Sequence, residues 1–157
     1  LNWWRDSCNE WCYARFEDGK FGDQKYLDDW TTRFKGIHVL KNLGGGVAPW
    51  NIQQYDLSSD KSFNLIFYHF HNYKILENDK VDLGSYTLNA NDINILYKPY
   101  SKHLEKITEA LKQIDLVNDY NGVVQYNPFN WKNILRKAKR IIKGSYNVVD
   151  KKELLEV

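Results

Sequence analysis

The stretch LYKPYSKHLEKITEALKQI, residues 96–114, has the periodicity of an amphipathic helix. Its apolar residues recur at three- and four-residue steps, which places them on one helix face; they are Leu96, Tyr97, Tyr100, Leu104, Ile107, Leu111 and Ile114. Pro99 is compatible with the first turn, where its missing N–H would have no partner in the helix. We therefore predict a long helix over this stretch.

The rest of the chain contributes shorter elements. An aromatic face at helical spacing predicts a helix over residues 2–17, and a second, short helix begins at Asp23 and ends near Gly36. Residues 65–70, LIFYHF, are β-branched and aromatic and give the clearest strand. Weaker strands are predicted at 37–40 and 85–88, a loop at 118–130, and a last helix at 131–142. The prediction is a helix-rich α/β chain with an incomplete sheet.

Composition limits the kind of protein. The chain has 157 residues, 43% of them hydrophobic and 15% aromatic, which suits one domain with a real core. Its net charge of +2 gives no electrostatic reason to expect a nucleic-acid partner. There is no methionine, and nothing near the front is typical of a signal peptide or a membrane span, so we expect the carboxyl-terminal part of a longer protein. Cys8 and Cys12, one helical turn apart, are expected to be reduced, which favours the cytoplasm.

Two polar clusters could bind a sugar. Gly22, Asp23 and Gln24 place a carboxylate and an amide at a helix start, where backbone donors also point outward. The alternative is that Asp23 is only an N-cap. Trp50 and Asn51 follow a glycine-rich loop and combine an aromatic face with an amide, a weaker indication of the same kind.

His69 and His71 lie two residues apart on the predicted strand and would face the same side. One or both could bind a metal ion, although a strand histidine is more often a hydrogen-bonded packing residue. No nucleophile motif and no P-loop lysine accompanies them.

The last predicted helix, Trp131 to Lys143, is amphipathic and basic. Its non-apolar positions include Lys132, Arg136, Lys137, Lys139, Arg140 and Lys143, with no acid among them. Two interpretations remain open: a solvated face on a peripheral helix, or an interfacial helix drawn to anionic lipid or to a phosphorylated acceptor.

Taken in order, these pieces resemble the carboxyl-terminal half of a bacterial glycosyltransferase of the GT-A type. GKFGDQKYLDDW (19–30), LGGGVAPWNI (43–52) and LIFYHFHN (65–72) look like blocks of nucleotide-diphospho-sugar transferases, and ILYKPYSKHLEKI (95–107) like the helix that follows them. The resemblance covers roughly residues 1 to 112. We accordingly expect an acceptor-side part over 1–115 and a separate tail, loop plus basic helix, over 116–157.

The resemblance implies roles for individual residues. In glycogenin-like enzymes an Asp-Gln pair lies beside the transferred sugar, which implies that Asp23 and Gln24 are catalytic and that Gly22 contacts substrate. Trp50 and Asn51 would shape the sugar pocket. His69 matches the histidine that, with an upstream Asp-x-Asp pair, holds Mn²⁺ or Mg²⁺ on the diphosphate, although the glycine of that motif is Asn72 here. His71 is a second substrate-binding candidate.

Two functions follow. The first is transfer of a hexose from a nucleotide-diphosphate sugar to a saccharide or lipid-linked acceptor, at the inner face of the membrane or elsewhere in the cytoplasm. The nucleotide pocket would then lie upstream, and the chain alone would be inactive. The second is a non-enzymatic carbohydrate- or protein-binding module built on the same aromatic residues.

Overall fold

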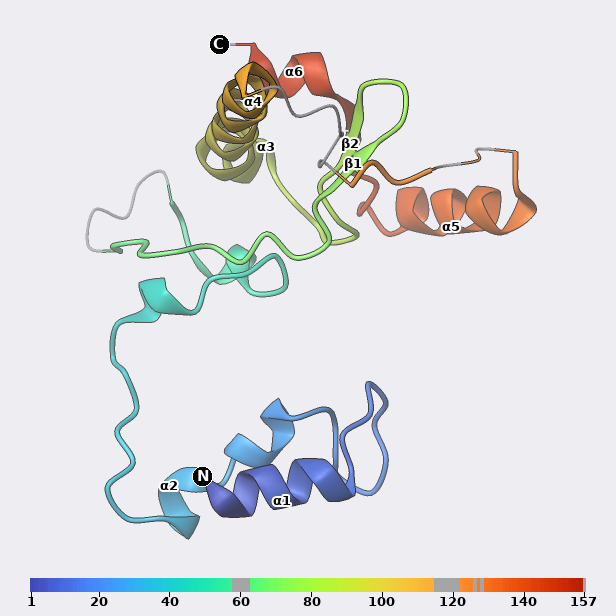
Figure 1. Cartoon of the computed structure of the whole chain (residues 1–157). Coiled ribbons are helices and arrows are strands. Elements are labelled where there is room, and N and C mark those ends of the chain that lie inside the picture. The colour runs from blue at the N-terminus through green and yellow to red at the C-terminus, as the bar shows by residue number, and fades with distance from the viewer. Residues whose placement is uncertain (58–62, 115–121, 126, 128, 157) are drawn as a thin grey trace. The chain divides into compact units, whose positions relative to one another are not determined.

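The computed structural model describes residues 1–57, 63–114, 122–125, 127 and 129–156, and the chain forms two compact units (Figure 1). Unit 1 comprises residues 1–41 and unit 2 residues 42–157.

Unit 1 consists of short helices joined by aromatic contacts. They are α1 (Asn2–Glu10), a 3-10 turn (Gln24–Leu27) and α2 (Trp30–Arg33). Trp3 packs edge-on against Tyr26 and Phe34 at centroid distances of 6.0 and 5.7 Å, and Trp4 packs against Trp30 at 6.3 Å. All 41 positions of this unit are described, and none of them is buried. Unit 1 therefore has aromatic clusters but no closed core.

Three predictions in unit 1 were wrong, two of them in the extent of a helix and one in expecting a strand. The helix predicted over 2–17 ends at Glu10, because Trp11 adopts extended backbone angles and a turn at Glu17–Lys20 follows. The helix predicted from Asp23 to Gly36 is split into a 3-10 turn and a single α turn. Residues 37–40 form no strand in the described structure; Leu40 is 75% exposed, so no burial favours a strand there.

Unit 2 is built on a small antiparallel sheet. The strands β1 (Lys74–Leu76), β2 (Lys80–Asp82) and β3 (Val148–Asp150) lie in that order. Val81 pairs with Ile75 on one side and Val149 on the other. Asn78 and Asp79 take positive φ angles of 59° and 52°, as the tight turn between β1 and β2 requires.

Helices surround this sheet (Figure 1). They are α3 (Ala90–Asp92), a π-helical segment (Ile93–Tyr97), α4 (Lys98–Gln113), α5 (Trp131–Ile142) and α6 (Lys151–Leu155), with 3-10 turns at Leu43–Gly45 and Ile52–Gln54. The core between them includes the fully buried side chains of Ile52, Val81, Leu83, Tyr97 and Leu154.

Two tyrosines in this core are hydrogen-bonded to each other. The Tyr68 and Tyr97 hydroxyls lie 3.1 Å apart. Burial raises the pKa of both phenols, that of Tyr97 to about 12, because the charged form would lose its hydration. Both remain neutral at physiological pH and serve as packing groups.

Two helix predictions are confirmed in unit 2. The predicted helix 96–114 is present but starts earlier, at α3, because Asn89 and Asp92 form a reciprocal capping box. The last helix spans 131–142 as predicted. Much of the predicted loop 118–130 lies outside the described residues.

Two strand predictions were wrong in this unit. Within 65–70 only Tyr68 forms an isolated bridge, with Val47, because the irregular glycine loop beside it cannot supply a regular ladder. Residues 85–88 are not a strand, since the side chain of Asn147 donates to the Gly84 and Tyr86 carbonyls that a neighbouring strand would have paired.

The fold class is mixed α/β, rich in helix, with one three-stranded antiparallel sheet among the described residues. The compact units do not divide at the predicted boundary near residue 115: β3 pairs with β2, so the tail belongs to unit 2. Within the described ranges we find no helix with the length and apolar character needed to cross a membrane.

Candidate functional site

Four aromatic side chains gather on the surface of unit 2. Trp50 contacts His69, His71 and Tyr86 at centroid distances of 5.5, 5.7 and 6.1 Å. The Trp50 residue is 52% exposed, so part of its indole is open to solvent. We call Trp50, His69, His71 and Tyr86 the aromatic platform.

The glycine loop positions Trp50. Gly44 lies so close to the neighbouring segment that a Cβ would come 1.8 Å from the Asn64 carbonyl oxygen, which excludes any larger residue. The side chain of Asn51 then clamps the loop, accepting from the Ala48 N–H and donating to the Gly46 carbonyl, both at 2.8 Å. Asn51 therefore holds the loop that presents Trp50.

The two histidines are held differently. His71 is hydrogen-bonded through Nδ1 to the Tyr86 hydroxyl at 3.0 Å. The His69 backbone N–H donates to the Val47 carbonyl, while His69 as a whole is exposed. In the part of the chain that the structure describes, no group of three or more His, Cys, Asp or Glu side chains could hold a metal ion. His69 and His71 thus form an incomplete donor set.

An open pocket of about 420 Å³ adjoins the platform. Trp50 and Tyr86 line it together with Gln53, Thr87, Lys143 and Ser145. An apolar ring face, hydroxyls, an amide and one ammonium group therefore border the same space. This combination can contact a face of a sugar ring, the hydroxyls of that sugar and a nearby negative charge.

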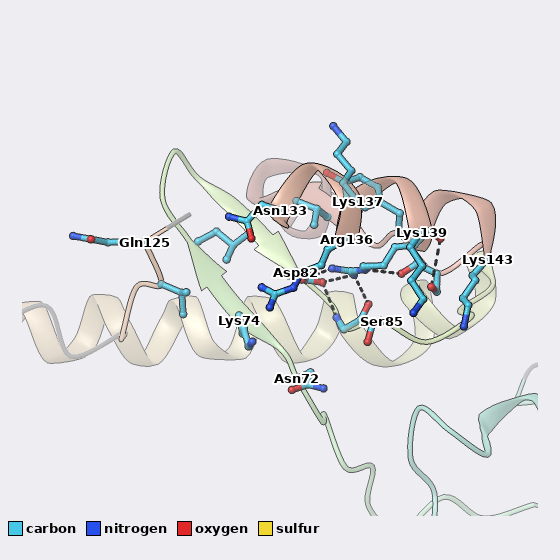
Figure 2. A pocket seen from close by; sticks show the side chains of 17 residues that line it. Asn72, Lys74, Asp82, Ser85, Gln125, Asn133, Arg136, Lys137, Lys139 and Lys143 are labelled. Atoms are coloured by element: carbon cyan, nitrogen blue, oxygen red, sulfur yellow. Dashed lines mark hydrogen bonds and ion pairs between the residues drawn. The ribbon is translucent and has the colours of Figure 1, made fainter. Parts of the chain in front are cut away.

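A larger pocket of about 550 Å³ lies between α5 and the strands (Figure 2). Six cationic residues line it, namely Lys74, Arg136, Lys137, Lys139, Arg140 and Lys143, against one acid, Asp82. We call it the basic pocket. Ser85, Lys143 and Ser145 line both pockets, so the two are neighbours.

Asp82 does not cancel this positive charge. Its carboxylate accepts two hydrogen bonds from Arg140, at 2.7 and 2.8 Å, and both side chains are largely covered. Arg140 also donates to the Gly84 carbonyl at 2.7 Å. The pair fixes α5 to β2. The other five cationic residues that line the basic pocket have no further acid among its lining residues to offset their charge.

The polar cluster of Gly22, Asp23 and Gln24 lies in unit 1. The Gly22 N–H donates to the Tyr13 carbonyl, and the Asp23 carbonyl accepts from the Trp4 indole N–H, each at 3.0 Å. Asp23 stands at the N-cap position of the 3-10 turn, but its side chain makes no capping hydrogen bond. The hydrogen bond that a simple N-capping role for Asp23 would require is therefore absent. Asp23 and Gln24 are both exposed.

The structure thus brings together three of the predicted residues, Trp50, His69 and His71, with Asn51 supporting them from behind. Sequence reasoning missed Tyr86 and Lys143 as neighbours of Trp50. Tyr86 had been assigned to a strand, and Lys143 to the polar side of a helix. The signal that could have found Tyr86 is Gly84, whose φ of +102° turns the chain there.

Comparison with known proteins gives two relatives, both from Bacillus subtilis (strain 168). The one named "Uncharacterized protein YfnD" is 31% identical over 119 residues, which are 69% of this chain and 38% of that protein. "Uncharacterized protein YfnF" is 29% identical over 129 residues, 78% of this chain and 42% of that protein. The chain therefore spans about two fifths of the length of these curated relatives. No family model and no solved structure matches it.

Proposed function

We propose that this chain is the acceptor-side part of a GT-A-type glycosyltransferase that moves a hexose from a nucleotide-diphosphate sugar to a hydroxyl acceptor. One observation carries the proposal: the half-exposed Trp50 borders a pocket that also contains Lys143, next to the basic pocket. The resemblance of the ordered sequence blocks supports the same function. The names of the two relatives state no activity, so they do not bear on it.

The chemistry of the two pockets suits a phosphorylated sugar. A pyranose presents C–H groups on its faces, which pack on an indole, and hydroxyls at its rim, which bond to exposed side chains such as Ser85 and Thr87. Phosphate oxygens favour Lys and Arg. A ligand with its sugar over Trp50 and its phosphates toward Lys143 would use both pockets.

Asp23 and Gln24 would act on sugar or acceptor hydroxyls in this proposal. Their exposure, and the absence of a capping bond from Asp23, leave the carboxylate and amide available to a ligand. Placed near the anomeric carbon, a carboxylate would stabilise the positive charge that develops there.

A divalent ion would offset charge on the leaving diphosphate. The described residues do not by themselves fit such an ion, because no carboxylate completes a group with His69 and His71 and hard cations prefer oxygen ligands. His69 is the proposed ligand from this chain.

The test is a transfer assay on the complete gene product. Purified protein is incubated with Mn²⁺ or Mg²⁺ and a panel of nucleotide-diphosphate sugars, and release of nucleoside diphosphate is measured with and without saccharide acceptors. Trp50→Ala should lower turnover about tenfold or more, the scale of losing one good stacking contact. Trp131→Ala, which removes another exposed tryptophan, is the matched control and should leave turnover unchanged in the absence of lipid.

The alternative is a carbohydrate-binding module, which Trp50 would serve equally well. It predicts that glycans bind, that Trp50→Ala abolishes binding, and that no nucleotide sugar is ever hydrolysed or transferred. That combination of results would reject glycosyl transfer and retain the platform as a sugar site. Binding of neither glycans nor nucleotide sugars would reject both.

A further inference from the structure

The helix α5 is attached to unit 2 by its polar side. Arg140 contacts Asp82 and Gly84, while Asn133 and Arg136 line the basic pocket under the helix (Figure 2). At about 100° of rotation per residue, these three positions share one side of the helix. A surface helix normally turns its apolar side to the protein. Here the polar side takes that place.

The apolar side of α5 faces away from the rest of unit 2. Five large residues on it are exposed over half or more of their surface: Trp131 65%, Ile134 51%, Leu135 58%, Ile141 56% and Ile142 86%. No residue of α5 is buried. Phe129, directly before the helix, is 88% exposed as well. The result is a continuous apolar strip, a feature that marks an interaction surface.

Basic residues flank this strip and no acid lies on the helix. Lys132 and Lys139 stand on one flank and Lys137 on the other, all of them exposed. Long lysine stems can lie along an apolar surface while their ammonium groups reach outward to phosphates. An apolar strip bordered by lysines on both sides is the pattern of a helix lying in a membrane interface.

We propose that α5 docks on an anionic lipid surface, with its apolar strip among the acyl chains and its flanking lysines on the headgroup phosphates. Such docking requires the apolar side of α5 to face the lipid, so the helix must be attached to unit 2 through its polar side, as it is here. Trp131 and Phe129 lie at the same end of the helix, where aromatic rings suit the interface. The inference stands independently of glycosyl transfer.

Charge complementarity selects the lipid over a second copy of the chain. Two α5 helices packed through their apolar strips would bring lysines of like sign together, which disfavours that pairing. An anionic bilayer supplies the apolar interior and the negative charge together, and the local attraction adds up over several basic residues.

Vesicle flotation of the full chain tests the proposal. Vesicles of phosphatidylcholine alone are compared with vesicles of phosphatidylcholine and phosphatidylglycerol, at low and high salt. Binding should be strong only to the anionic vesicles and should weaken with salt. The double variant Leu135→Gln, Ile142→Gln should reduce the partition coefficient about tenfold or more, because it removes two apolar side chains from the lipid phase.

A matched control changes apolar residues of similar exposure elsewhere in unit 2. Ile66 and Phe67 are 58% and 56% exposed, and Ile66→Gln, Phe67→Gln should leave vesicle binding unchanged. Circular dichroism of each variant shows that the fold is intact. Lys132→Ala, Lys139→Ala should weaken binding to the anionic vesicles only.

Three results would overturn the proposal. The first is equal binding to neutral and anionic vesicles, and the second is equal loss in the Ile66 and Leu135 variants. The third combines two observations: the unmodified chain does not bind vesicles, and analytical ultracentrifugation shows a dimer that the variant Leu135→Gln, Ile142→Gln dissociates. A second copy of the chain would then cover the strip. Quenching of Trp131 by bromine-labelled lipid, judged against a Trp131→Phe variant, reports directly whether the strip enters the bilayer.

Discussion

Unit 1 and unit 2 differ in how their apolar residues are used. Unit 1 contains four of the six tryptophans, yet none of its 41 residues is buried. Unit 2 closes a core with aliphatic side chains such as Ile52 and Leu83, both 0% exposed. A unit this short has too few residues to cover large aromatic rings on all sides, because a small chain buries a smaller fraction of its surface than a large one. Aromatic content therefore predicts contacts, and length decides whether they become a core.

The difference matters for the candidate residues. Asp23 and Gln24 lie in the unit without a core, whereas Trp50, His69 and His71 are attached to the unit that has one. Precise catalytic geometry needs side chains held by packing. We therefore expect the side chains of the platform in unit 2 to be held more rigidly than those of unit 1.

The largest effect should come from opening the core of unit 2. Leu83→Ala removes a side chain that is 0% exposed and should lower the free energy of unfolding by about 2–5 kcal/mol. The matched change in unit 1, Leu27→Ala, affects a residue that is 40% exposed and should cost about 1 kcal/mol or less. Amide hydrogen exchange, followed residue by residue, measures the two units separately.

Equal costs for the two leucines would contradict the comparison, since they would mean that unit 1 contains a closed core as well. Protection factors in unit 1 as high as those around Val81 would lead to the same conclusion.

The second effect concerns turnover. If Asp23 orients a sugar hydroxyl or stabilises charge near the anomeric carbon, Asp23→Asn should lower turnover of the complete enzyme about a hundredfold, or about 2.7 kcal/mol, with folding unchanged. Asn caps a helix as well as Asp does, so a capping role predicts almost no change. Gln24→Ala should also lower turnover if the Gln24 amide contacts a ligand hydroxyl. Because Gln24 has no capping role, such a loss could not be explained by helix capping. Turnover and thermal unfolding are measured on the same preparations.

Full activity in both variants would remove unit 1 from the catalytic site. The comparison would then be sharper still, because unit 2 alone would carry the ligand-binding residues.

Local signals in the sequence predicted the two long helices of unit 2 well, the helices of unit 1 less well and the sheet poorly. The periodicity at 96–114 and at 131–142 is a property of neighbouring residues, so it could be read directly. Strand formation depends on a partner elsewhere in the chain. Among the described residues, the apolar and aromatic run at 65–70 pairs only through the Val47–Tyr68 bridge, whereas KIL and KVD, at 74–76 and 80–82, become strands because each has a partner strand.

The same limit applies to the candidate site. The sequence marked Trp50, His69 and His71 as candidates but did not predict that they meet, because their contact depends on the bridge between Val47 and Tyr68. The approach of Lys143 to Trp50 could not be predicted either, because it depends on where β3 and α5 fold back over the sheet. Periodicity predicted the two faces of α5 but not which face would meet the protein, since that depends on Asp82, some 58 residues away from Arg140 in sequence.

The third effect is smaller and tests how α5 is held. Arg140→Lys keeps the positive charge but loses the two-pronged contact with Asp82, and should cost about 1.5 kcal/mol in the free energy of unfolding. Lys80→Ala, which removes the exposed pair with Asp150, should cost less than about 1 kcal/mol. Urea denaturation of the two variants makes the comparison. Equal losses would show that Asp82 contributes no more than a surface ion pair.

The smallest effect should be that of metal. His69 and His71 without a carboxylate form a poor site for a hard cation, so the chain alone should bind Mn²⁺ with a dissociation constant above about 1 mM. At that concentration the ion would then raise the free energy of unfolding by less than about 0.4 kcal/mol, which is the stabilisation expected at half-saturation. Titration calorimetry measures the affinity, and His69→Ala identifies the ligand. Tight binding that disappears in His69→Ala would show that the 157 residues already contain a complete metal site, and that unit 2 can hold the ion without further chain. Tight binding that survives in His69→Ala would place the metal elsewhere and remove His69 from the proposed site.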